Sequence, residues 1–241
     1  MQSRNLKSVL RALVLAAFAL LVSSAFAGTT YYNIDQKTGW QSCSVCAGAG
    51  GSGPSAYHTT ASGVKSPSRD GNSRRFFLGG STPYSNALWW KQLGPNSGVR
   101  SFKYDLYYYI KNPSAAQALE FDVNQSVNGK KYIFGTECDF KGTKTWHVYD
   151  PYNRAWKTTS IACNVPKAYT WHHVVLEFKR RDDGKTGFLS VTINGSKHYF
   201  NRSYAPRSTS AREINVAFQM DGNKYQTDYT VWLDSVKLSI W

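Results

Sequence analysis

From residue 74 to the C-terminus, short runs of apolar and aromatic residues alternate with turn-forming residues. Within several runs every second residue is apolar, as over 102–110, 119–123, 172–178 and 214–218. A period of two is typical of a β-strand with one buried and one exposed face. The pattern predicts strands at residues 75–78, 99–110, 118–125, 131–139, 145–149, 155–161, 172–180, 188–193, 197–202, 213–220 and 229–240.

Pairs of turn-forming residues separate these runs. Asn194-Gly195 lies between two predicted strands, and it favours a two-residue hairpin because both residues adopt positive φ readily. Asp183-Gly184 and Asn128-Gly129 are further predicted turns. Residues 85–93 carry a weak helical period, which no other stretch of the mature chain shares. Many short strands with frequent turns predict an all-β fold, an antiparallel β-sandwich of the jelly-roll type.

The first 27 residues have the order of segments found in an export leader. Arg4, Lys7 and Arg11 precede an apolar run over 12–22, and Ala25-Phe26-Ala27 follows. This order predicts a signal peptide over 1–27 and a secreted protein, extracellular or periplasmic. The apolar run is shorter than the ~20 residues that span a bilayer, and we expect no transmembrane segment in the mature chain. We expect an irregular Gly/Ser-rich segment over 28–73 and one jelly-roll domain over 74–241.

All four cysteines, Cys43, Cys46, Cys138 and Cys163, lie in the mature part. An even number in an exported chain indicates disulfides, and four cysteines allow three connectivities. We favour Cys43–Cys46, which would pin the N-terminal segment, and Cys138–Cys163, because each pair lies within one local region. A redox or zinc site at Cys43–Cys46 is the alternative, although no second pair with metal-ligand spacing accompanies it.

The chain is basic, with a formal net charge of +14, of which +11 remains once the three cations of the leader are removed. Such a charge suits acidic polysaccharides, anionic cell surfaces or nucleic acid. The cations are scattered, however, and no run of five like charges occurs. A solvated basic surface is the simpler interpretation, and we expect no nucleic-acid partner.

The alternation that buries Phe121 turns a polar set to the opposite face of its strand. Glu120, Asp122 and Asn124 belong to that set, and adjacent carboxylates on one strand repel each other unless a ligand meets them. The same rule turns outward, on strands that we expect to be neighbours, Trp171, His173, Glu177, Glu213, Asn215 and Gln219. A solvent-facing polar face is the alternative interpretation.

Three short motifs resemble the concanavalin A-like lectin and glucanase superfamily. Residues 118–123, Ala-Leu-Glu-Phe-Asp-Val, resemble its Glu-x-Asp strand. Trp171-His172-His173-Val174 with the later Asn194-Gly195 resembles laminin-G-type modules, and residues 231–238 resemble the last strand of carbohydrate-binding jelly rolls. The resemblance covers residues 74–241 and implies the fold more strongly than a function.

Family-16-type glucanases extend the Glu-x-Asp strand to a second glutamate, which serves as the general acid. Here Asn124 or Gln125 stands at that position, and neither can deliver a proton. The resemblance therefore argues against hydrolysis by the retaining mechanism, unless Glu177 or Glu137 substitutes from another strand. If the chain were an enzyme, its catalytic residues would be Glu120, Asp122 and Glu177. A polysaccharide lyase of the alginate-lyase type is a further alternative, but the Gln-x-His and Tyr-Phe-Lys-x-Gly strands of that family are missing.

Legume-type lectins use a similar Glu-Phe-Asp strand to open a manganese and calcium site. That family needs an Asn, an Asp and a His shortly downstream, and here no Asp or His follows until Asp139 and His147. We therefore predict no cofactor and no metal site of that type. A rearranged calcium site stays open as an alternative, because calcium ligands need not be contiguous in sequence.

Aromatic residues make up 15% of the chain, more than a core of this size requires. Exposed aromatic rings can stack on the apolar faces of sugar rings while amides and carboxylates bind the hydroxyls. We therefore predict a lectin-like protein that binds a polysaccharide or a cell-surface glycan, with an acidic glycan as one alternative. The predicted binding residues are Glu120, Asp122, Asn124, Trp146, Trp171, His173, Asn215 and Gln219. An enzyme of glycans and a structural or adhesive surface module are the rival hypotheses.

Overall fold

The computed structural model describes residues 28–44 and 54–241. Within them the chain is almost entirely β-structure, with a single 3₁₀ turn. The elements are β1 (Thr29–Tyr31), η1 (Ile34–Gln36), β2 (Gln41–Cys43), β3 (Tyr57–Val64), β4 (Ser73–Gly79), β5 (Asn86–Gln92), β6 (Ser101–Ile110), β7 (Ala116–Val127), β8 (Lys130–Phe134), β9 (Thr136–Asp139), β10 (Thr145–Asp150), β11 (Ala155–Ala162), β12 (Trp171–Arg180), β13 (Thr186–Ile193), β14 (Ser196–Tyr204), β15 (Arg207–Ser208), β16 (Glu213–Gly222) and β17 (Tyr229–Ile240).

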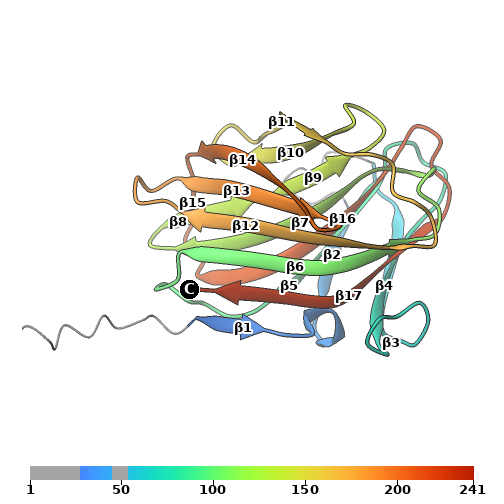
Figure 1. Cartoon of the computed structure of the whole chain (residues 1–241), viewed down its shortest axis with the longest axis horizontal. Coiled ribbons are helices and arrows are strands. Elements are labelled where there is room, and N and C mark those ends of the chain that lie inside the picture. Colours follow the sequence, from blue (N-terminus) through green and yellow to red (C-terminus); the bar gives the residue numbers. More distant parts are fainter. Residues whose placement is uncertain (1–27, 45–53) are drawn as a thin grey trace, which may run out of the picture.

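The strands form two antiparallel sheets that stack face to face (Figure 1). Sheet A has the order β14-β13-β12-β6-β17-β4-β3, with β1 added along β17. Sheet B has the order β11-β10-β9-β7-β16-β5-β2, with β8 paired to β7 and β15 paired to β8. Every strand pair in both sheets is antiparallel, so the architecture is the predicted antiparallel β-sandwich.

The core lies between the sheets and consists of the alternating apolar positions that the sequence indicated. Phe76 of sheet A packs edge-on against Phe218 of sheet B at 4.9 Å between ring centroids. Phe121 packs against Phe218 at 5.5 Å, and Phe102 against Phe134 at 5.1 Å. All five rings are buried. Because the core uses one face of each strand, the side chains on the opposite face are not needed for packing between the sheets and can form a binding or catalytic site.

Two local predictions have different outcomes. Asn194 and Gly195 both have positive φ, 49° and 90°, and they join β13 to β14 as the predicted hairpin turn. The weak helical period over 85–93 is wrong, because β5 occupies most of that stretch. Its buried residues Ala87 and Trp89 alternate with half-buried ones, and pairing with β16 satisfies the backbone of the segment.

The N-terminal segment is less irregular than its composition indicates. It holds β1, β2 and β3, which pair with β17, β5 and β4 respectively. The predicted Cys138–Cys163 disulfide is present, with 5.5 Å between the two Cα atoms. Cys46, and with it the predicted Cys43–Cys46 pair, lies outside the described residues, as does the predicted signal peptide.

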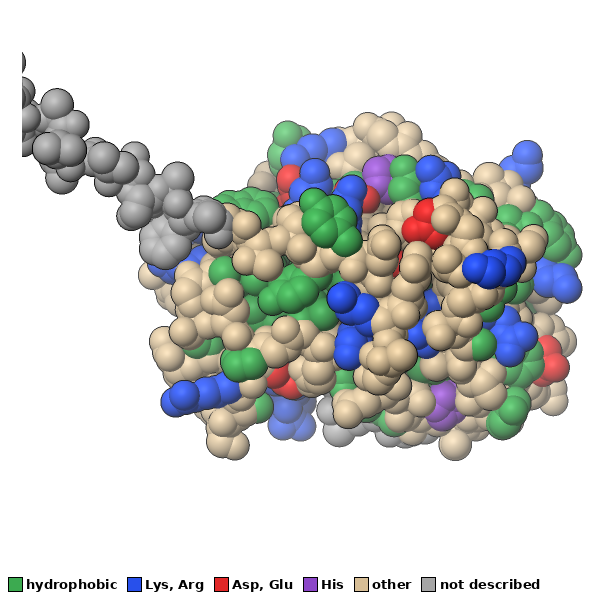
Figure 2. Space-filling view, turned by 90° about the horizontal axis from the view of Figure 1, so that it is seen from below, with side chains coloured by type: hydrophobic (Ala, Val, Ile, Leu, Met, Phe, Trp, Pro, Cys, Tyr) green, Lys and Arg blue, Asp and Glu red, His purple; other side chains and the backbone are tan. Residues whose placement is uncertain are grey.

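Lys and Arg side chains are spread over the surface seen in Figure 2 and do not gather in one patch. This agrees with the scattered cations of the sequence. Over the part of the chain that the structure describes, no helix has the length and apolar character needed to cross a bilayer.

Candidate functional site

Strand β7 lies at the centre of the site, because it pairs with β16 on one side and β9 on the other. Phe121 and Val123 face the core, so Glu120, Asp122 and Asn124 point away from sheet A. We call this side of the strands the outer face of sheet B. The register of β16 places Gln219 opposite Glu120 and Asn215 opposite Asn124.

The amides of this face are paired with each other across the strands. Asn124 Nδ2 donates a hydrogen bond of 2.9 Å to Asn215 Oδ1. Gln219 Nε2 donates to Glu120 Oε1 and, at 2.9 Å, to Asp221 Oδ1. The structure therefore brings Glu120, Asp122, Asn124, Asn215 and Gln219 together on one face, as predicted. The face is not open at four of these positions, however, because Glu120, Asp122, Asn215 and Gln219 are at most 5% exposed.

Trp171 and His173 do not belong to this face. Both lie on β12, which is a strand of sheet A. There the His173 ring stacks on the Tyr107 ring, with 4.2 Å between the centroids, and His173 Nε2 forms a 2.8 Å hydrogen bond with Asp105 Oδ1. The prediction that they share a face with Glu120 was wrong because alternation identifies the face of a strand and not the sheet that contains it.

Trp146 also lies elsewhere than predicted. It is 2% exposed and faces the core, where the centroid of its ring lies 6.4 Å from that of Phe121. The alternation of side chains along β10 explains this position, because Trp146 and Val148 are both buried between the sheets. The neighbouring positions, His147 and Tyr149, therefore turn to the outer face of sheet B.

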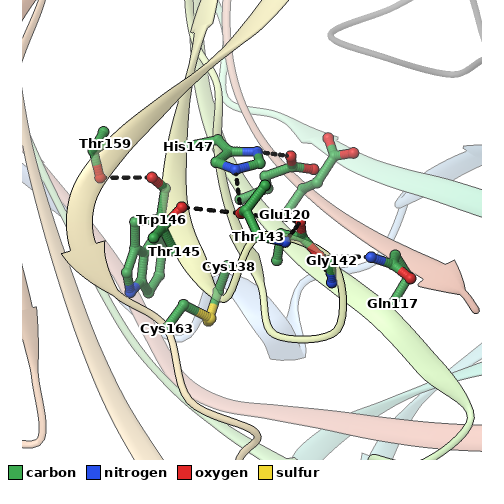
Figure 3. A network of polar contacts seen from close by, with 12 residues as sticks. Gln117, Glu120, Cys138, Gly142, Thr143, Thr145, Trp146, His147, Thr159 and Cys163 are labelled. Carbon is green, nitrogen blue, oxygen red and sulfur yellow. Dashed lines mark hydrogen bonds and ion pairs between the residues drawn. A yellow bond between two sulfur atoms is a disulfide. The ribbon is translucent and has the colours of Figure 1, made fainter.

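Three carboxylates meet on this face, and we call them the acid cluster: Glu120 of β7, Glu137 of β9 and Asp221 of β16. Glu137 is directly opposite Glu120 in the register, and Asp221 is two residues beyond Gln219. One oxygen of each carboxylate lies within 4.8 Å of the other two. Figure 3 shows Glu120, Thr143 and His147 close together, with His147 hydrogen-bonded to Thr143.

Hydrogen bonds hold two members of this neighbourhood in place. His147 Nδ1 bonds Glu137 Oε1 at 2.5 Å, and His147 Nε2 bonds Thr143 Oγ1 at 2.7 Å. The Thr136 N–H donates to Asp122 Oδ1 at 3.1 Å. Glu120 Oε2 and Asp221 Oδ2 are buried and accept no hydrogen bond from an N–H or hydroxyl group of the described residues, and the two side chains are close enough to hydrogen-bond each other when they share a proton. No Lys or Arg of the described chain forms an ion pair with Asp122 or the acid cluster.

Burial is the main electrostatic effect on these acids. It raises the pKa of Asp221 to about 8, and the charge of Glu137 adds to the rise. Burial also raises the pKa of Asp122 to about 8, against the lowering by the Thr136 N–H. The pKa of Glu120 is raised well above its ordinary value by burial and by the charges of Asp221 and Asp122. The sheet therefore holds these groups together at a cost in free energy unless protons or a cation neutralise them.

Of the two predicted substitute acids, the structure separates Glu177 from the site. Glu177 lies on sheet A, where Ser190 and Lys197 donate to it. Although burial raises the pKa of Glu177, these hydrogen bonds and the Lys197 charge lower it overall. Glu137 is instead the carboxylate that faces Glu120 across β7 and β9.

An aromatic row runs beside the acids on the same face. The register places Trp90 of β5 opposite Ala217, which is itself opposite Asp122. On the other side of Asp122, Tyr149 is opposite Trp156, and their ring centroids are 5.2 Å apart. Next to Trp156 lies an open cleft of about 700 Å³ between β11 and β14, lined by Trp156, Lys157, Thr158, Asn201, Arg202, Ser203 and Tyr204.

The sequence did not predict His147, Tyr149 or Asp221 for the site, and it predicted Glu137 only as a substitute acid. Alternation is the signal that could have found them. In Glu137-Cys138-Asp139 and in His147-Val148-Tyr149, the first and third residues lie on the face opposite to the buried middle residue. What the sequence does not contain is the strand order β10-β9-β7-β16, which makes them neighbours.

Comparisons with known proteins place the chain by fold. A scan of protein-family models and a search of curated proteins found no match. One similar solved structure was reported with endo-acting O-glycanases that members of the human gut microbiota express to initiate mucin breakdown. It has a TM-score of 0.50 and 10% identity to this chain, and the match covers 88% of this chain and 98% of that one.

Two further likenesses are of the same kind. A carbohydrate esterase from a Shiga toxin-encoding bacteriophage has a TM-score of 0.47 and 14% identity, over 88% of this chain and 99% of that chain. An alginate lyase has a TM-score of 0.46 and 14% identity, over 83% and 97% of the two chains. At such low identity the likeness with a TM-score of 0.50 concerns the fold alone. The fold itself, two stacked antiparallel sheets, is the β-sandwich that the sequence pattern predicted.

Proposed function

We propose that this chain is a secreted glycan-binding protein whose binding surface is the outer face of sheet B. The observation that carries the proposal is the pair of tryptophans, Trp90 and Trp156, on the same face as the acid and amide side chains, with the buried Tyr149 packed against Trp156. Trp90 and Trp156 are half-buried, so part of each ring reaches solvent. A ring in this setting can stack on a sugar while neighbouring polar groups select its hydroxyls.

The cleft beside Trp156 extends the proposed surface. Lys157 and Arg202 line it together with Tyr204, and these two cations fit a glycan that carries carboxylate or sulfate groups. The predicted signal peptide over 1–27 would provide the export that such a role requires.

The test is binding of the mature chain to a panel of plant and bacterial polysaccharides, neutral and uronate-containing, by affinity electrophoresis and calorimetry. Trp156→Ala and Trp90→Ala are each expected to weaken binding about tenfold, which corresponds to about 1.4 kcal/mol of lost stacking. Trp241→Ala is the matched control, because Trp241 is 49% exposed and follows β17 of sheet A. Binding that is unchanged in both test variants would refute the proposed surface.

Release of reducing sugars is measured on the same panel, because Glu137 opposite Glu120 is the kind of carboxyl pair that a retaining glycosidase uses. Release that is lost in Glu120→Gln and in Glu137→Gln would replace the binding proposal with a hydrolase. The absence of release, together with binding, supports the proposal.

A further inference from the structure

The acid cluster presents a problem that the glycan proposal does not solve. Glu120 is 2% exposed, and its Oε2 accepts no hydrogen bond from an N–H or hydroxyl group of the described residues. Asp221 Oδ2 is in the same condition. A buried carboxylate oxygen without a partner is costly, and each such group in a native protein needs a compensating ligand or proton.

We propose that Glu120, Glu137 and Asp221 form a binding site for one Ca²⁺ ion. The site lies on the same face as the proposed glycan surface, but it depends only on the three carboxylates and does not require a glycan.

The separation of the carboxylates fits the size of this ion. Ca²⁺ lies ~2.3–2.6 Å from its oxygen ligands, so two ligands on opposite sides of the ion are roughly 4.6–5.2 Å apart. One oxygen from each member of the acid cluster lies within 4.8 Å of the other two. A single Ca²⁺ can therefore contact all three without movement of a strand. Ca²⁺ is favoured over Mg²⁺ because it accepts irregular sets of oxygen ligands, whereas Mg²⁺ requires near-ideal octahedral geometry and usually keeps several of its waters.

The donor set excludes the softer metals. All three ligands are carboxylates, which suit calcium, magnesium and manganese. His147 is the nearest nitrogen ligand, but both of its ring nitrogens are already bonded, Nδ1 to Glu137 and Nε2 to Thr143. His147 therefore positions Glu137 and leaves the oxygen set intact, in the way that outer hydrogen bonds orient metal ligands.

The sheet provides the rigidity that the site needs. Its three ligands come from β9, β7 and β16, three consecutive strands of sheet B whose registers are fixed by backbone pairing. Such a site differs from the contiguous calcium loop that the lectin resemblance would have required. When the three carboxyl groups are ionised, Ca²⁺ would neutralise two of their three negative charges, which no described Lys or Arg balances.

The experiment uses the mature chain, freed of metal with a chelator, and adds no polysaccharide. CaCl₂ is titrated by calorimetry, and the unfolding temperature is followed in CaCl₂, in MgCl₂ and in NaCl of equal ionic strength. We expect saturable binding of one Ca²⁺ with a Kd of about 10⁻³ M or tighter. We also expect a rise in unfolding temperature with CaCl₂ that MgCl₂ reproduces only at concentrations about tenfold higher.

Asp221→Asn tests the ligand without changing its shape. It should weaken Ca²⁺ binding at least tenfold, whereas its unfolding temperature without Ca²⁺ should equal or exceed that of the metal-free wild type, because the variant lacks a buried carboxyl group that repels its neighbours when it ionises. Asp150→Asn is the control, since Asp150 is a buried acid of the same sheet whose oxygens already bond Asn153. Its Ca²⁺ affinity should match the wild type.

The proposal is overturned if the folded wild type shows no saturable Ca²⁺ heat and no stabilisation by CaCl₂, in which case protons neutralise the cluster. Equal Ca²⁺ affinity in Asp221→Asn and the wild type would also overturn it. Because no polysaccharide is present, neither result depends on whether the chain binds a glycan.

Discussion

The buried carboxyl group of Asp35 gives the clearest quantitative prediction. Asp35 lies in η1 and is wholly buried beneath the end of sheet A. Its Oδ1 accepts a 2.9 Å hydrogen bond from the Val236 N–H, whereas its Oδ2 has no partner among the described residues. The Arg74 guanidinium is close, but it donates to the backbone carbonyl of Asp35 and to that of Lys37.

These surroundings favour the neutral acid. Burial raises the pKa of Asp35 from 3.8 to about 7, and the charges of Asp234 and Asp70 add to the rise, against the lowering by the Val236 N–H. The folded chain therefore keeps a proton that the unfolded chain releases between about pH 4 and pH 7. Folding stability from this group is present below pH 4 and is lost as the pH rises towards 7. A shift of about three pKa units corresponds to a loss on the order of 4 kcal/mol, more than half of it between pH 5 and pH 8.

Asp35→Asn removes this titration and keeps the shape of the side chain. The assay is urea unfolding of the wild type and the variant at several values between pH 5 and pH 8. The wild type should lose stability relative to Asp35→Asn as the pH rises, so that the difference between the two moves in favour of the variant. Parallel stability profiles for the two proteins across this range would refute the reasoning, because they would mean that Asp35 is already ionised in the folded chain.

Four further changes have defined expected results. Replacing Cys138 and Cys163 together by Ser should cost about 3.5 kcal/mol in urea unfolding, since the disulfide closes a loop with a sequence separation of 25. Phe218→Ala should cost about 3–5 kcal/mol in the same assay, because the ring fills the centre of the core. Gly195→Ala should lower stability by roughly 1 kcal/mol, because its φ is 90°. His173→Ala should leave polysaccharide affinity unchanged, and a loss would mean that sheet A contributes to the site.

Alternation in the sequence predicted which residues of each strand face the core. It did not predict which strands lie next to each other. Alternation around Phe121 and Phe218 assigned the core correctly, because burial of one face leaves a period of two in the chain itself. Trp171 and His173 occupy alternate positions of β12 that the pattern predicted to face outward, yet the pairing of β12 with β6 places both residues in sheet A. Strand order is set by pairings distant in sequence, which leave no local signal.

The same limit explains the acid cluster. Glu137 was placed inside one long predicted strand, 131–139, which in the structure divides at Gly135 into β8 and β9. Asp221 lies one residue beyond the predicted strand end at 220, within β16. Each acid alone is an ordinary polar residue in the sequence, and only the packing of β7 between β9 and β16 makes them a cluster.

The first described strands complete both layers of the sandwich. β1 lies along β17 in sheet A, next to the C-terminus (Figure 1), and β3 covers β4, while β2 covers β5 in sheet B. A protein shortened to begin at residue 74 would therefore expose unsatisfied backbone on β4, β5 and part of β17. Bare strand edges recruit other chains, so such a truncation should form oligomers or aggregates during expression. Any recombinant form intended for the binding experiments should start no later than Gly28.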